Sequence, residues 1–130
     1  MFAADGLPVS RELTKVPNSK KALRLGELAR ERGRHAELHP RLFDAFWARG
    51  LDLGDDDVLV AEAEAAGLDA AEAREVLASE RYADVVARET DAALDAGAGG
   101  VPAWVVDERL LIPGAQPEEV FERVLEKIGY

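Results

Sequence analysis

Two histidines in this sequence have the residue type and the spacing for metal chemistry. His35 and His39 are four residues apart, with Glu37 between them, as in metal-binding pairs on a helix. However, His39 precedes Pro40, which disfavours helical geometry at His39, and no third ligand is nearby. The sequence therefore favours a solvated surface or a helix start for this pair, and it predicts no metal ion or other cofactor.

A group of aspartates could suggest a calcium site. It comprises Asp52, Asp55, Asp56 and Asp57, but it lacks the glutamate spacing of an EF-hand loop. Asp55 is also explained as the N-cap of a helix that begins at about Asp56. A solvated turn is therefore the favoured interpretation of this segment.

The third candidate is a proline at the start of an apolar run near the C-terminus. Pro102 directly precedes the run from Ala103 to Val106, and three charged residues separate this run from a second one, Leu110 to Ile112. This is the pattern of a β-hairpin with a polar turn. Because proline cannot donate to a sheet, it belongs at the first position of the strand. The cis form is energetically cheap only for a bond that precedes proline, so Pro102 is a candidate cis-proline.

The composition limits the remaining chemistry and the partners. The 130 residues include no cysteine, which excludes disulfides and thiol redox chemistry within the chain. A net charge of −10 argues against nucleic acid and anionic membranes, which require clustered Lys and Arg. No apolar run approaches the ~20 residues of a membrane span, and a secretory signal pattern is lacking. We therefore expect a soluble, cytoplasmic, bacterial protein that binds neither nucleic acid nor a membrane.

Most of the chain before the hairpin has the periodicity of helices. Apolar residues recur at spacings of three and four, and asparagine, aspartate or glycine stands at the expected helix ends. The largest apolar stripe includes Phe43, Phe46 and Trp47, for which core packing is favoured over the lining of a substrate pocket. The expected helices cover approximately residues 19–32, 40–49 with a possible start at 34, 56–66, 69–78 and 80–96, with a last helix from Pro117.

The hairpin region also resembles a known family. The segments Gly100-Val101-Pro102-Ala103-Trp104-Val105-Val106-Asp107 and Pro113-Gly114-Ala115-Gln116-Pro117-Glu118-Glu119-Val120-Phe121 are similar to the C-terminal half of a DsbA-family thioredoxin fold. Its Gly-Ala-Gln-Pro junction resembles the FrnE-like branch. The resemblance implies an α+β, mostly helical fold, with a helical insertion domain and its leading connection over residues 1–96. Residues 97–130 would then form a partial thioredoxin-like unit of a β-hairpin and a C-terminal helix.

The resemblance assigns the site residues as well. In the family, the residue before the cis-proline offers its backbone N–H and C=O to an extended peptide or to glutathione, and Val101 has that position here. Pro102 would fix the loop so that these groups point outward. The front half of the family fold, with its Cys-x-x-C helix, has no counterpart in this sequence. We therefore expect no catalytic residue and no catalysis by this chain alone.

Three functions are consistent with this resemblance. The first is a thiol–disulfide oxidoreductase-like protein of the DsbA family, truncated and without redox cysteines in this chain. The alternative is a non-catalytic, dimeric interaction module that keeps the peptide-binding loop. A relative of the glutathione-dependent isomerases and transferases is a third interpretation. Because an exposed strand edge tends to pair with another chain, we expect residues 103–106 either to pair with their copy in a homodimer or to be covered by a rearranged helix.

Overall fold

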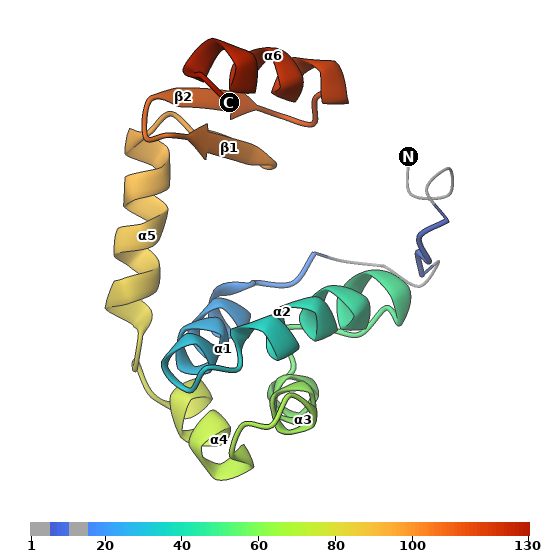
Figure 1. The fold of residues 1–130 in the computed structure, drawn as a ribbon. Helices are drawn as coiled ribbons and strands as arrows, with labels where there is room; N and C mark the ends of the chain where they lie inside the picture. The colour runs from blue at the N-terminus through green and yellow to red at the C-terminus, as the bar shows by residue number, and fades with distance from the viewer. Residues whose placement is uncertain (1–5, 11–15) are drawn as a thin grey trace. The chain divides into compact units, whose positions relative to one another are not determined.

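The computed structural model of the chain describes residues 6–10 and 16–130. The contacts divide it into two compact units, Met1–Ala87 and Arg88–Tyr130, and the division falls within helix α5 (Ala83–Asp95) (Figure 1). The sequence places a domain boundary after residue 96, and that assignment stays a prediction. Among the described residues, no helix is both long and apolar enough to span a bilayer.

The first unit is built from short helices. They are α1 (Lys20–Glu31), α2 (His35–Phe43), a π-helix (Asp44–Ala48), α3 (Asp56–Ala65) and α4 (Ala70–Ala78), followed by the start of α5. Their core is an apolar cluster whose largest fully buried members are Leu25, Leu28, Leu38, Leu59 and Val76.

Local capping signals determine where these helices begin. The Asn18 side chain accepts a hydrogen bond from the backbone N–H of Lys20 at 3.0 Å, just before α1. Asp55 accepts from the N–H of Asp57 at 2.8 Å and so caps α3, as the sequence predicted. Asp69 caps α4 in the same way, from Glu72 at 2.8 Å. The boundaries of α1, α3 and α4 therefore agree with the sequence to within one or two residues.

Helix α2 differs from its prediction. It begins at His35 and contains both His39 and Pro40, so the expectation that Pro40 would force His39 out of helical geometry is wrong. The proline removes one backbone donor, but Leu38 and Leu42 are buried and hold the helix against the core. The predicted helix over 40–49 is therefore the end of α2 followed by a π-helix, in which the N–H of Arg49 bonds to the carbonyl of Asp44 at 3.0 Å.

The apolar stripe on this segment divides between core and surface. Leu38, Leu42 and Ala45 are buried, whereas Phe43 is 55% exposed and Trp47 is 36% exposed. Core packing was therefore the wrong expectation for these two aromatic side chains. The reason is helical phase, because successive residues are separated by about 100° around the axis, which turns Phe43 away from Leu42.

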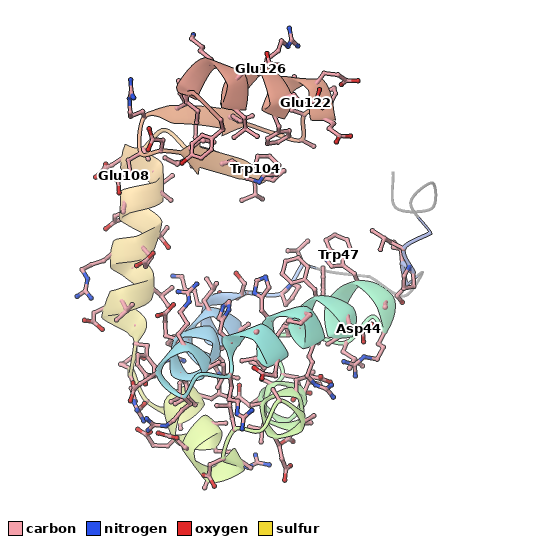
Figure 2. The ribbon with its side chains drawn as sticks, viewed as in Figure 1. Asp44, Trp47, Trp104, Glu108, Glu122 and Glu126 are labelled. Carbon is pink, nitrogen blue, oxygen red and sulfur yellow. The ribbon has the colours of Figure 1, made fainter. Side chains whose placement is uncertain are left out.

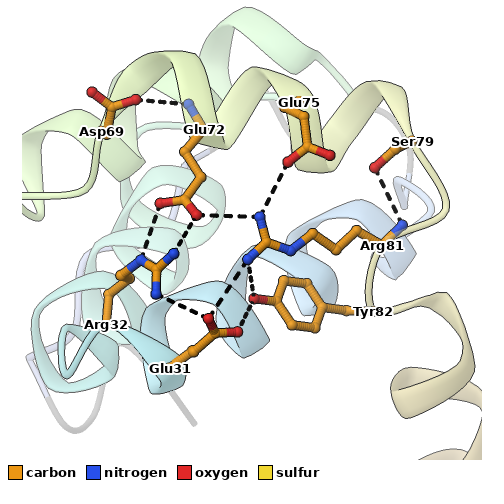
Figure 3. Close-up of polar contacts among 8 residues, drawn as sticks. All are labelled: Glu31, Arg32, Asp69, Glu72, Glu75, Ser79, Arg81 and Tyr82. Atoms are coloured by element: carbon orange, nitrogen blue, oxygen red, sulfur yellow. Dashed lines mark hydrogen bonds and ion pairs between the residues drawn. The ribbon is translucent and has the colours of Figure 1, made fainter.

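A network of ion pairs joins α1, α4 and the segment before α5 (Figure 3). Arg32 Nη2 lies 2.5 Å from Glu72 Oε1, and Arg81 Nη1 lies 3.2 Å from the same oxygen. The Tyr82 hydroxyl donates to Glu31 Oε2, and Arg81 Nη2 donates to that hydroxyl at 3.0 Å. Tyr82 has a φ of +66°, which an aromatic residue rarely adopts. This conformation precedes α5, which begins three residues later than the sequence predicted.

The second unit combines the end of α5 with a hairpin and a helix. Strands β1 (Ala103–Val106) and β2 (Leu110–Pro113) pair antiparallel, and α6 (Glu118–Ile128) follows. The hairpin and the last helix thus form where the sequence predicted them. Trp104 packs edge-on against Phe121 of α6, with 5.0 Å between the ring centroids. Ile112 is the one buried apolar side chain among the residues described in this unit.

Candidate functional site

The candidate site lies at the start of β1 and is held by the hairpin. The turn after β1 has positive φ at both Asp107 and Glu108, +53° and +52°, and the N–H of Arg109 bonds to the carbonyl of Val106 at 3.1 Å. Positive φ at two successive turn residues matches the right-handed twist of paired strands. The register of the hairpin, and with it the position of β1, is set at this end.

The other end of β1 is tied to the end of β2. The peptide bond between Val101 and Pro102 is cis. The carbonyl of Pro102 accepts a hydrogen bond from the N–H of Gly114 at 2.8 Å, and Gly114 has a φ of +72° that favours glycine. Gln116 Nε2 donates to the carbonyl of Pro113 at 2.7 Å, which closes the Gly-Ala-Gln-Pro junction. The loop before β1 is therefore fixed on its Pro102 side.

Val101 is almost fully exposed in this loop. The residue as a whole is 96% exposed, and no hydrogen bond to its N–H or C=O occurs among the described residues. Strand β1 has β2 as its neighbour on one side, and on its other side it has no partner strand within the described part of the chain. Both backbone groups of Val101 are therefore available to a guest.

The surroundings of the loop are apolar. Trp104 and Val105 occupy successive positions of β1 and point to opposite faces of the hairpin. Trp104 is 39% exposed beside Phe121, and Val105 is 52% exposed on the other face (Figure 2 labels Trp104). The site can thus supply backbone hydrogen bonds and apolar contacts to an extended chain.

The four aspartates considered as a calcium site lie just before α3 and at its start. The aspartates have other roles: Asp55 caps α3, Asp56 lies 2.6 Å from Lys21 Nζ, and Asp57 lies 3.1 Å from Arg74 Nη1. This arrangement is the solvated turn that the sequence favoured. Among residues 6–10 and 16–130, no three histidine or acidic side chains gather as a metal site.

Sequence reasoning missed a buried ion cluster beside the π-helix. Glu62 of α3 is only 5% exposed, and its Oε1 lies 2.8 Å from Arg49 Nη2. Arg41 Nε lies 3.5 Å from Glu62 Oε2, and an open pocket of about 380 Å³ is lined by Arg41, Arg49, Pro40 and Asp44. The pKa of Arg49 is raised, chiefly by its hydrogen bond to Glu62. The available signal was the position of Glu62, three residues after Leu59 on the buried side of α3.

The chain belongs to the DsbA-like thioredoxin domain family, whose sequence model matches residues 2–126. It is 33% identical over 98 residues to the uncharacterized protein YwbO of Bacillus subtilis, a match that covers 75% of this chain and 48% of YwbO. It is also similar to the crystal structure of a probable DsbA oxidoreductase from Streptomyces coelicolor. That match has a TM-score of 0.82 and 39% identity, and it covers 97% of this chain and 55% of the other.

These comparisons confirm the predicted family and the predicted fold class, a mostly helical α+β arrangement of the DsbA thioredoxin type. The chain spans about half the length of both relatives. The assignment to the FrnE-like branch stays a prediction.

Proposed function

We propose that this chain is the substrate-receiving part of a thiol–disulfide oxidoreductase of the DsbA family. Membership of the DsbA-like thioredoxin domain family supports the reaction class. Because these 130 residues contain no cysteine, the redox thiols must be supplied from outside this sequence. The chain's own contribution is then to hold the substrate beside those thiols.

The observation that carries this proposal is the accessibility of Val101. An extended peptide can add to a sheet edge when backbone donors and acceptors are free, and those of Val101 are free and solvent-exposed immediately before the edge strand β1. The guest backbone would bond to Val101, and Pro102 would hold the loop through its carbonyl bond to Gly114. Side chains of the guest would contact Trp104 or Val105.

Peptide titration of the ¹⁵N-labelled chain tests this role. An extended peptide should shift the amide signal of Val101 and those of β1, with little change in α3 or α4. Val101→Pro removes the N–H donor and should weaken binding about tenfold, because one backbone hydrogen bond contributes about 0.5–1.5 kcal/mol and the carbonyl geometry is also lost. Val101→Ala keeps the donor and is the matched control. Equal binding by the two variants would reject the role of Val101.

The reaction class needs a separate test. A longer protein that carries this sequence together with a Cys-x-x-C motif should reduce insulin in the presence of a thiol reductant. Val101→Pro in that protein should lower the rate more than Val101→Ala does. An inactive longer protein with intact cysteines would end the oxidoreductase proposal, whereas the peptide titration would still stand. Glutathione in place of the peptide tests the isomerase and transferase interpretation, which a calorimetric titration without heat would remove.

A second candidate function is a non-catalytic dimer module. The observation that favours it is the edge of β1, which is unpaired within the described part of the chain and carries the half-exposed Val105. Light scattering during size exclusion should then give the mass of a dimer. Val105→Lys should return it to a monomer, because charged side chains oppose pairing of strand edges, while Leu94→Lys on α5 should not. A monomeric wild-type chain would exclude this candidate.

A further inference from the structure

The two histidines that the sequence analysis set aside lie side by side in the structure. His35 and His39 are both within α2, and their ring centroids are 5.1 Å apart with 24° between the ring planes. Pro40 does not interrupt α2, so both histidines are helical. Residues four apart on a helix lie on the same face, which brings the two rings together. One of the two reasons for setting them aside, a non-helical His39, does not apply to the folded chain. The other reason, the lack of a third protein ligand, holds for the described residues.

The spacing of the rings suits a shared ion. A metal at roughly 2.0–2.1 Å from two imidazole nitrogens, at a tetrahedral angle, holds those nitrogens about 3.3 Å apart and the ring centroids about 5 Å apart. The observed centroid distance is 5.1 Å. The nitrogen lone pairs lie in the planes of the rings, and these planes are nearly parallel, so the lone pairs do not point at a common ion in this conformation. Rotation about χ2, a torsion with broad minima in histidine, directs them towards one ion. A small side-chain movement on a fixed helix therefore completes the chelate.

The surroundings leave the ring nitrogens free and limit the movement of one ring. Neither imidazole has a hydrogen bond to the rest of the described chain, and His39 is exposed. Phe43, one turn further along α2, packs against the His39 ring at 4.9 Å between centroids. Glu37 is paired with Arg34 at 3.6 Å and does not compete for the rings.

We propose that His35 and His39 together bind one divalent late transition-metal ion, such as Zn²⁺ or Ni²⁺. Imidazole prefers these ions to Mg²⁺ and Ca²⁺, which require oxygen ligands. With two protein ligands, the remaining coordination positions are filled by water. The net charge of −10 raises the local concentration of cations around the chain. This site is independent of Val101 and of the proposed oxidoreductase role.

The composition of the chain makes the test direct, because it has only two histidines and no cysteine. Calorimetric titration with ZnCl₂ should give one ion per wild-type chain. His39→Gln should weaken binding about tenfold or more, because a second donor on the same scaffold adds an avidity of roughly 10²–10⁴. The double variant His35→Gln/His39→Gln measures the background from carboxylates.

A spacing control separates the chelate from the mere presence of two imidazoles. Ala36 is exposed, so the variant Ala36→His/His39→Gln keeps two histidines but places them next to each other in sequence, where they do not share a face. Its affinity for Zn²⁺ should equal that of His39→Gln. Circular dichroism should show the same helix content for all variants. Binding by the spacing control as tight as wild type, or wild-type binding equal to the double variant, would overturn the proposal.

Discussion

The two compact units of this chain differ in how they are stabilised. Residues 1–87 contain a cluster of fully buried side chains from α1 to α4, whereas one buried apolar side chain, Ile112, occurs among the described residues of 88–130. A two-stranded hairpin is marginal in water unless other elements cover it. The comparison teaches that core packing supports the helical unit, while the unit with the candidate site depends on its turn, its junction and one aromatic pair.

The largest expected difference between the units comes from truncating a leucine in each. Leu28→Ala removes a fully buried side chain of α1 and should lower the free energy of unfolding by about 2–5 kcal/mol. Leu125→Ala in α6, where the residue is 43% exposed, should cost less than about 1 kcal/mol. Urea unfolding followed by fluorescence measures both, because Trp47 reports on the first unit and Trp104 on the second. Equal costs for both variants would contradict the comparison.

A buried arginine provides the second test. Arg24 is 7% exposed, and its guanidinium donates to the carbonyls of Leu77, at 3.3 Å, and Ser79, at the end of α4. Arg24→Met leaves both carbonyls without this donor and should cost about 1–3 kcal/mol of unfolding free energy. Arg109→Met in the hairpin turn, where the side chain is 75% exposed, should change it by about 0.5 kcal/mol or less. Thermal unfolding of the two variants gives the comparison.

The turn of the hairpin allows a stabilising change in the weaker unit. Glu108 has a φ of +52°, a left-handed conformation that disfavours side chains with a Cβ. Glu108→Gly relieves this cost and, after the entropy of glycine is subtracted, should stabilise the hairpin by about 0.5–1 kcal/mol. Amide hydrogen exchange in β2 should slow accordingly. Faster exchange would show that the turn does not limit the stability of the hairpin.

The smallest expected effect is an acid sensitivity confined to the helical unit. The Tyr82 hydroxyl, and then the charges of Arg32 and Arg81, hold the pKa of Glu31 below its ordinary value of 4.5. The hydrogen bond from Arg32 similarly lowers the pKa of Glu72. A carboxyl group whose pKa is lower in the folded than in the unfolded chain stabilises the folded state at pH values above its unfolded pKa. The stabilisation from Glu31 and Glu72 is therefore lost as the pH falls below about 4.5.

The variant Glu72→Gln should therefore flatten the loss of thermal stability between pH 5 and about pH 3. Glu122→Gln, an exposed carboxyl on α6, is the matched control and should leave the slope unchanged. The slope of unfolding temperature against pH, measured for the wild type and both variants, gives the result. An unchanged slope for Glu72→Gln would show that the ion pairs of Figure 3 contribute nothing measurable.

The features that the sequence predicted correctly depend on neighbouring residues. The caps at Asp55 and Asp69 bond to amides two or three residues away. The hairpin follows from two apolar runs around a charged turn. Pro102 immediately precedes β1, which begins at Ala103, one residue later than the sequence placed it. Such signals are short in range, so a single sequence contains them. The family resemblance came from this same region.

The features that the sequence did not predict depend on contacts between distant residues. Tyr82 keeps its positive φ while bonded to Glu31, 51 residues earlier in the chain. Glu62 is buried because Arg49 reaches it from another helix. Burial of Leu38 and Leu42 similarly keeps Pro40 within α2. Packing of this kind overrides local preference. For Glu62 the sequence offered only its position on the buried side of α3 and not its arginine partner.

The π-helix also constrains the length of the chain. Its wider turn sets the angular position of Arg49, whose Nη2 then lies 2.8 Å from the carboxylate of Glu62. Deleting one residue between Pro40 and Arg49 would rotate the guanidinium by about 100° around the helix axis. The buried carboxylate of Glu62 would then lack its arginine partner, which is strongly destabilising. Natural variation in length should therefore avoid this segment.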